Sequence, residues 1–166
     1  METLDDEWEL SPEAAHPNAR RLLKSEFYWD VTDDDSPFGN DTGADTLEYY
    51  RAWIAESDDD EDFLHRLFEE WDVDWTSAES LPDSELKARL EDEQFDILTY
   101  DDVVIAAAFA QLVLEGEPSK DMAALAVRCL KRQALPEVIE FRGWSDPAER
   151  RVRCAEMLQV MQRAVR

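Results

Sequence analysis

The spacing of hydrophobic side chains along the chain predicts helices over most of its length. Between residues 61 and 71 the apolar positions Phe63, Leu67 and Trp71 recur every four residues, which places them on one helical face. Comparable patterns or end signals predict further helices over residues 17–27, 41–56, 82–92, 100–115, 119–134 and 145–166, with a short helical turn at 136–141. We therefore expect an all-α fold of about six helices.

Residues 100–115 form the most apolar of these segments. The run VVIAAAFAQLVL is apolar on most sides, as is typical of a helix buried all round. Thr99 followed by Asp102 resembles a helix-capping box, and Gly116 before Pro118 is a typical helix end. The sequence therefore predicts that this helix is the centre of the fold.

Other segments give weaker signals. WDVDW at 71–75 alternates apolar and acidic residues, and FYWDV at 27–31 is aromatic, so each is compatible with one very short strand. Ser145-Asp146-Pro147 opens the last helix. The apolar spacing there predicts a buried face of Val152, Ala155, Leu158, Met161 or Gln162, and Val165.

The length of 166 residues and the 44% hydrophobic content favour a single domain, 1–166, with a real core. We expect residues 1–16 to include a flexible N-terminal segment. The net charge is −24, and it is uneven: residues 119–166 hold ten Lys/Arg and six Asp/Glu (+4), which leaves −28 on residues 1–118. Such an acidic body repels phosphates, so we expect neither nucleic-acid nor membrane binding. A basic protein partner, plain solubility and a salt-adapted host all remain compatible with it.

Targeting signals and disulfides are not indicated. The opening METLDDEWEL is acidic, where a secretory signal would be basic, and the longest apolar run, Val103–Ala110, is too short to span a bilayer. Cys129 and Cys154 both fall inside predicted helices. We expect a cytoplasmic protein with reduced, inert thiols.

The segment SPFGNDTGADTLEYY, 36–50, is the first candidate site because it holds two of the four glycines. A phosphate-binding loop is disfavoured, since no basic residue occurs from 31 to 50. Carboxylates are ligands for calcium or magnesium. The metal candidates are Asp33, Asp35, Asp41 and Asp45, although the helix–loop–helix calcium pattern fails, because Phe38 stands where glycine is required. The favoured interpretation is a turn followed by a helix capped by Asn40 or Asp41.

Catalytic patterns are scarce. His65 lies four residues from both Glu61 and Glu69, a metal-ligand spacing, but on the face opposite the predicted apolar stripe. With two histidines in the chain there is no convincing nucleophile–base set. We therefore expect no enzymatic activity and no cofactor.

Acidic clusters at 33–35 and 58–62 suggest another role. Clustered carboxylates steer basic proteins toward a binding surface, and exposed aromatic residues nearby commonly anchor such complexes. The binding candidates are Phe38, Asn40, Asp41, Asp45, Tyr49 and Trp75. Our main hypothesis is a non-enzymatic acidic interaction module, of inhibitor or immunity type, for a basic partner. The alternative is a small-ligand or divalent-metal site at 38–45.

The N-terminal half also resembles a known group. HPNARRLL, FYWD and SPFGNDTGADTLEYYRAW are similar to uncharacterised bacterial YfeS-like proteins. The core Pro37-Phe38-Gly39-Asn40-Asp41 resembles a Pro-Phe-x-Asn-Asp motif of wider bacterial domains of unknown function, and DDVVIAAAFAQLVLEGEP at 101–118 resembles their Ala-rich second element. This chain departs from the wider group by placing about 36 residues ahead of the motif. The resemblance implies a helical bacterial protein but transfers no catalytic residue, and either a monomer or a homodimer fits.

Overall fold

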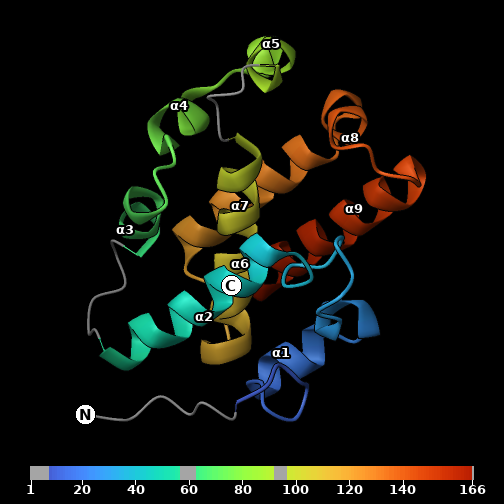
Figure 1. Ribbon diagram of the computed structural model, residues 1–166. Coiled ribbons are helices and arrows are strands. Elements are labelled where there is room, and N and C mark those ends of the chain that lie inside the picture. Colours follow the sequence, from blue (N-terminus) through green and yellow to red (C-terminus); the bar gives the residue numbers. More distant parts are fainter. Residues whose placement is uncertain (1–7, 57–62, 92–96, 166) are drawn as a thin grey trace.

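The computed structural model describes residues 8–56, 63–91 and 97–165, and these residues are helical or in turns and loops throughout (Figure 1). The α-helices are α1 (Pro17–Leu22), α2 (Asp41–Glu56), α3 (Phe63–Glu70), α4 (Trp75–Ser80), α5 (Leu86–Leu90), α6 (Ile97–Glu115), α7 (Lys120–Gln133), α8 (Pro136–Arg142) and α9 (Pro147–Ala164). Two 3-10 turns are η1 (Glu26–Trp29) and η2 (Asp83–Glu85). The all-α prediction is confirmed. The predicted count of about six is too low, because several short helices separate the long ones.

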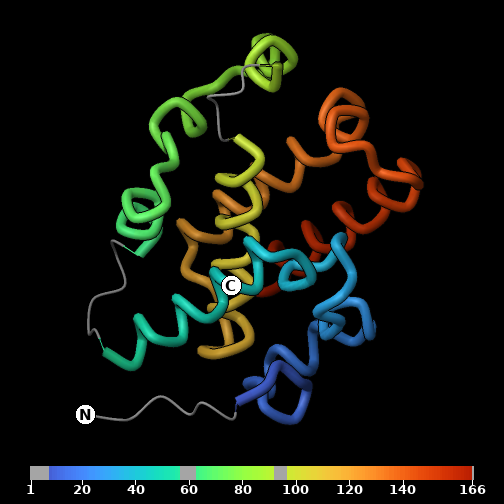
Figure 2. The backbone as a smooth tube through the Cα atoms, in the orientation of Figure 1, coloured from blue at the N-terminus to red at the C-terminus, as the bar shows by residue number. Residues whose placement is uncertain are grey.

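Helix α6 is the centre of the fold, as the sequence predicts. It is buried almost continuously from Tyr100 to Val113, and α2, α7, α1, α3 and α4 all pack against it. Figures 1 and 2 show α2 crossing α6 on one side, with α7 and α9 behind. This nearly continuous burial explains why α6 has no polar stripe. By length and composition α6 could also cross a membrane. However, 78% of its most apolar 18-residue segment is buried inside the protein, as in the core helix of a globular fold.

The start of α6 differs from the prediction. The helix begins at Ile97, so Thr99 lies inside the first turn and does not cap it. Asp102 instead accepts a hydrogen bond from Arg142 Nη2 at 2.9 Å, which ties α6 to the end of α8. Burial raises the pKa of Asp102, and the arginine opposes that shift. Thr99 and Asp102 therefore have the spacing of a capping box but do not cap α6.

Neither predicted short strand forms in the described residues. At 71–75 the chain turns sharply, because Asp72 adopts a left-handed conformation (φ 56°) and Val73 N–H donates to the Phe68 carbonyl. Asp74 then caps α4, with its side chain accepting from Ser77 N–H at 3.1 Å. The hydrogen bonds from Ser77 lower the pKa of Asp74. Of residues 27–31, the first three belong to η1, and the chain then enters a turn at Val31.

A polar cluster is buried between α6 and α7. Asp101 is fully buried and receives Arg132 Nη2 at 2.6 Å, Arg132 Nε at 3.0 Å and Gln133 Nε2 at 2.7 Å. Arg132 Nη1 also donates to the Ala78 carbonyl at 3.2 Å. Three elements thus meet at the Asp101–Arg132 pair, in which the two charges compensate each other where water is excluded.

The buried face of α9 is rotated from the predicted one. Cys154 and Met157 are buried, whereas Val152 is 55% exposed and Ala155 is exposed as well. Met161 is buried, as predicted. The physical reason lies at Arg150, which is 96% buried because its guanidinium pairs with Asp35 and covers the ring of Trp144. A buried arginine at the start of the helix fixes which face turns inward, and hydrophobic spacing alone does not reveal it.

Both cysteines are free and buried, as expected for core thiols. Burial raises the pKa of Cys129 and of Cys154, so both stay protonated at neutral pH. The acidic segment 58–62, the start of the predicted 61–71 helix, and residues 1–7 of the expected N-terminal segment lie outside the described residues.

Candidate functional site

The segment 30–40 is held by its own polar side chains. Asp30 Oδ1 accepts from both the N–H and the hydroxyl of Thr32, and these bonds lower the pKa of Asp30. Asp33 Oδ1 accepts from Asp35 N–H at 3.0 Å, and the Ser36 hydroxyl donates to the Asp30 carbonyl at 2.8 Å. Such short-range bonds fold the chain into successive turns. The carboxylates of Asp30 and Asp33 therefore stabilise the loop.

Gly39 and Gly43 lie where the segment 36–50 packs closely against its own backbone. A Cβ at Gly39 would lie 1.7 Å from the Asp33 carbonyl oxygen, and one at Gly43 would lie 2.0 Å from the Pro37 carbonyl oxygen. Asn40 Oδ1 accepts from Gly43 N–H at 2.7 Å, which is a helix cap at the start of α2. The predicted helix start is confirmed, with Asn40 as the cap. Both glycines are needed for close packing of the turn on α2.

An ion pair joins this loop to α9. Arg150 Nη1 donates to Asp35 Oδ1 at 3.0 Å and to the Asp35 carbonyl at 3.3 Å. The arginine is buried and the Asp35 side chain is 15% exposed, so the pair is largely shielded from water. Asp35 is thereby committed to a structural contact.

One open cavity, which we call the loop hollow, lies between this loop and the α8–α9 connection. It has a volume of about 590 Å³. Its lining residues are Asp34, Gly39, Asn40 and Asp41 on one side and Arg142, Gly143, Trp144 and Ser145 on the other. Of the predicted binding candidates, Asn40 and Asp41 line the hollow, while Phe38 is 1% exposed and fills the core. Asp45 is exposed one turn further along α2.

The predicted metal ligands are distributed over this region. Asp33 and Asp35 make the loop contacts described above, and Asp41 and Asp45 are exposed on α2. In the described residues no group of three or more His, Cys, Asp and Glu side chains is placed to hold one ion. The calcium or magnesium hypothesis stays a prediction.

A second hollow, which we call the aromatic groove, separates α2 from α3. Its volume is about 380 Å³. The lining residues are Tyr49, Ala52, Trp53, Glu56, Phe63, Arg66, Leu67 and Glu70. Tyr49 is 39% exposed, and its hydroxyl donates to Glu70 Oε1 at 3.1 Å. Arg66 lies over the Trp53 ring at 5.7 Å. The groove therefore combines aromatic walls with acidic groups from both helices.

Trp75, the other predicted anchor, does not line the groove. It stacks on His65 with ring centroids 5.0 Å apart, and it also stacks on Phe68. His65 Nε2 lies 4.0 Å from Glu79 Oε1 on α4. Of the two acids at the predicted helical spacing, no ion pair joins Glu69 to His65, and Glu61 lies outside the described residues. Tyr49 and Trp75 thus belong to different sides of α3.

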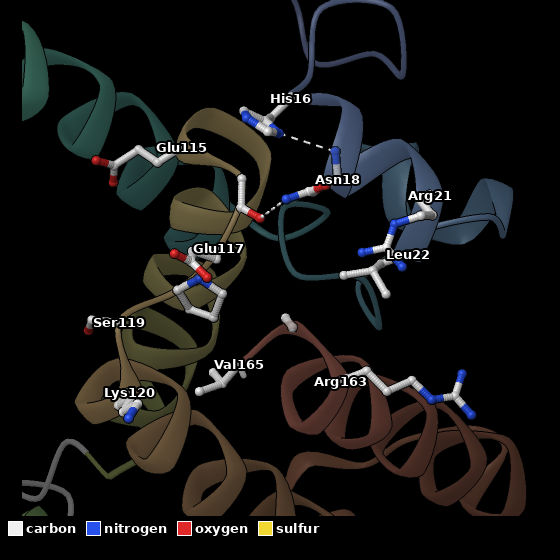
Figure 3. Close-up of a pocket in the computed structure, with 13 residues that line it drawn as sticks. His16, Asn18, Arg21, Leu22, Glu115, Glu117, Ser119, Lys120, Arg163 and Val165 are labelled. Atoms are coloured by element: carbon white, nitrogen blue, oxygen red, sulfur yellow. Dashed lines mark hydrogen bonds between the residues drawn. The ribbon is translucent and has the colours of Figure 1, made fainter.

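A third cavity, the terminal hollow, lies where α1, the α6–α7 turn and the end of α9 come together (Figure 3). His16 N–H donates to the Val113 carbonyl at 2.8 Å, and Asn18 Nδ2 donates to the Gly116 carbonyl at 3.2 Å. Gly116 has a φ of 94°, and a Cβ there would meet the His16 ring at 2.6 Å. These contacts fix α1 against the turn and so build one wall of the cavity.

The chain is similar to a protein of Escherichia coli (strain K12) named uncharacterized protein YfeS. The two are 26% identical over 145 residues, which cover 86% of this chain and 59% of YfeS. The similarity supports the YfeS-like resemblance of the sequence, and the name of this relative states no activity. No family model and no solved structure matches the chain.

The aligned length means that the chain spans about 59% of YfeS. The similarity therefore transfers no site, and function must be argued from the cavities themselves. Sequence reasoning found one wall of the loop hollow and one residue of the aromatic groove. It missed Arg142 to Ser145 and Trp53. The tripeptide Arg-Gly-Trp at 142–144, a charge and an aromatic ring around glycine, is the signal that could have drawn attention.

Proposed function

We propose that this protein is a non-enzymatic acidic interaction module that binds a basic segment of a protein partner in the aromatic groove. The observation that carries the proposal is the exposed ring of Tyr49 beside Glu70, with Glu56 at the same groove. Aromatic faces and carboxylates together favour guanidinium and ammonium groups.

The groove already accommodates a cation of its own. Arg66 lies over the Trp53 ring, and that ring packs edge-on against Phe63 at 5.9 Å. A partner arginine or lysine stacked on Tyr49 would use the same chemistry on the exposed side of the groove. Tyr49 is itself held edge-on against Trp71 at 5.5 Å, so it loses little freedom on binding.

The surrounding charge supports fast capture of a basic protein. Asp41 and Asp45 are exposed on α2, the same helix that supplies Tyr49. In the sequence, the five acids of residues 58–62 join α2 to α3 between Glu56 and Phe63. A net charge of −24 raises the encounter rate with cationic partners and makes it sensitive to salt.

Two matched variants test this proposal. The immobilised protein is used to capture partners from lysate of the source cell at low and moderate salt. The affinity of each variant for the captured basic protein is then measured. We expect Tyr49→Ala to weaken binding roughly thirtyfold, as for a central anchor residue. Phe141→Ala, which removes another half-exposed aromatic ring from α8, should leave affinity unchanged.

Charge is tested in the same assay with Glu70→Gln, which keeps an acceptor for Tyr49, and with Glu140→Gln as the exposed control on α8. Loss of affinity with Glu70→Gln alone would support the groove. A captured protein that binds Tyr49→Ala and Phe141→Ala equally well would contradict the proposal. Retention of that protein at high salt would also contradict it.

The second candidate is small-ligand or divalent-cation binding in the loop hollow. Asp34 and Asp41 line this cavity, and the charge of Arg142 on its other side is compensated by Asp102. If the site holds calcium or magnesium, either ion should raise the melting temperature, and Asp41→Asn should abolish the rise while Asp83→Asn, on η2, preserves it. A melting temperature that neither ion changes would refute cation binding there.

We also propose that the protein acts in the bacterial cytoplasm, because both of its cysteines are free thiols. Its net charge of −24 disfavours binding to nucleic acid and to anionic membranes. Both a monomer and a homodimer fit the proposal. Two copies carrying −24 each repel one another, which favours a basic protein over a second copy as the occupant of the groove.

A further inference from the structure

The aromatic groove lies between two helical stripes that have the same spacing. Each stripe occupies positions i, i+3, i+4 and i+7 of its helix: Tyr49, Ala52, Trp53 and Glu56 on α2, and Phe63, Arg66, Leu67 and Glu70 on α3. This spacing places each set on one helical face. At a rise of about 1.5 Å per residue, each stripe is about 10 Å long.

Contacts across the groove fix the direction of the two stripes. The Tyr49 hydroxyl, from the first position on α2, donates to Glu70 Oε1, from the last position on α3, at 3.1 Å. Trp53, the third position on α2, has the Arg66 guanidinium 5.7 Å from its ring centroid and packs edge-on against Phe63 at 5.9 Å. Arg66 and Phe63 are the second and first positions on α3. The stripes therefore run antiparallel.

The charges along the groove have the order negative, positive, negative. Glu70 lies at one end, beside Tyr49, and Glu56 ends the α2 stripe about 10 Å away. Arg66 lies between these ends, over Trp53. None of the three charged groups takes part in an ion pair within the described residues. Each carboxylate therefore attracts a cation of a partner, while the central guanidinium repels one.

The base of the groove is apolar. Leu67 and Phe63 are each 3% exposed, and Ala52 contributes only a methyl group. The volume of about 380 Å³ is near the lower end of the range of about 300 to 1,000 Å³ that is usual for ligand pockets. The groove is therefore suited to receive a few side chains of a partner whose backbone stays outside.

We propose that the partner segment bound by the aromatic groove is an amphipathic α-helix with basic residues at positions i and i+7 and an apolar residue at i+4. The two basic residues of such a helix are about 10 Å apart on one face, which matches the separation of Glu70 and Glu56 along the groove. The apolar residue covers Ala52 and avoids the repulsion that a central cation would meet at Arg66. This inference rests on the proposed function and adds the conformation and residue pattern of the partner.

Other backbone conformations give different spacings. Side chains on one face of an extended strand repeat about every 6.7 Å, so two basic residues would be about 7 or 13 Å apart. A polyproline II helix advances about 9 Å in three residues and is therefore the competing conformation. A helix lying in a groove is itself a common mode of peptide recognition.

The test measures binding of fluorescein-labelled synthetic peptides to the intact chain by fluorescence polarisation at constant ionic strength. The reference peptide is an alanine-rich helix with arginine at i and i+7 and leucine at i+4, and the register control moves the second arginine to i+5. We expect the reference peptide to bind about tenfold more tightly than the control of equal charge. Equal binding of the two helices would overturn the proposal. Tighter binding of a proline-rich peptide with arginine at i and i+3 would overturn it as well.

A third helical peptide, with lysine in place of the central leucine, tests the role of Arg66. It should bind more weakly than the reference peptide although its positive charge is larger. Arg66→Gln should remove that difference, a result that overall charge does not produce. Tighter binding of the lysine peptide to the unchanged protein would contradict the central position of Arg66.

Variants of the protein locate the two ends. Glu56→Gln and Glu70→Gln should each weaken the reference peptide about tenfold. Glu69→Gln, an exposed neighbour on α3 that does not line the groove, should leave its affinity unchanged. Equal weakening by all three would show that binding follows overall charge.

Failure of this inference can be told apart from failure of the proposed function. If the captured protein requires Tyr49 but the reference peptide has no advantage over its controls, the helical pattern is wrong and the groove remains the binding site. If neither the captured protein nor the reference peptide requires Tyr49, the groove is not the binding site, and both proposals are wrong.

Discussion

Replacing Gly39 with alanine is expected to lower the free energy of unfolding by about 3 kcal/mol. The added methyl group would lie 1.7 Å from the Asp33 carbonyl oxygen and 2.4 Å from Ser36 Oγ. The carbonyl belongs to a backbone that the Asp30, Asp33 and Ser36 hydrogen bonds hold in place. Relief therefore requires the whole loop to move, and the start of α2 would move with it.

Gly143→Ala is the matched control for this prediction. Gly143 has a φ of 74° but no atom within 4 Å of an added Cβ, so alanine there should cost only the left-handed strain of about 1 kcal/mol. Equilibrium unfolding in urea measures both variants. Equal stability losses at the two glycines would show that the loop is not closely packed around residue 39.

Asp101→Asn is expected to destabilise the protein by about 3 to 5 kcal/mol. The substitution preserves size but removes the negative charge that compensates Arg132, which is 4% exposed between α6 and α7. The arginine would then be a buried, unpaired charge. Gln133 would also face an altered acceptor, because its Nε2 donates to Asp101 Oδ2.

The neighbouring residue provides the comparison. Asp102 pairs with Arg142, and both side chains are 17% exposed, so water can partly replace the bond in Asp102→Asn. A loss of about 1 kcal/mol is expected there. Thermal and urea unfolding check both values, and Asp101→Leu combined with Arg132→Met should recover much of the loss. A small effect of Asp101→Asn, similar to that of Asp102→Asn, would contradict the assignment of a dry ion pair.

The helical core was predictable because its signal is local. A segment such as 100–115 is apolar on every side, and only a central helix can bury that much surface. The face of α9 was not predictable in this way. Val152 and Cys154 offer two comparable apolar stripes, and the choice between them depends on Arg150 reaching Asp35, a residue 115 positions earlier.

The candidate sites show the same division. The cap by Asn40 and the turn glycines follow from short-range chemistry, so the helix start at 41 could be predicted. The opposite wall of the loop hollow, Arg142 to Ser145, is supplied by a segment about one hundred residues away. No spacing in the sequence brings those residues together. Charge clustering pointed to Tyr49, but the groove also needs the packing of α3 beside α2.

The contact between Asp35 and Arg150 also bears on how the chain is made. The ribosome synthesises the loop 30–40 long before α9. The bond between Asp35 and Arg150 can therefore form only after α9 has emerged. The same delay applies to Asn18, which bonds to Gly116. The segment around Asp35 is therefore expected to gain its protease resistance only after α9 has emerged from the ribosome.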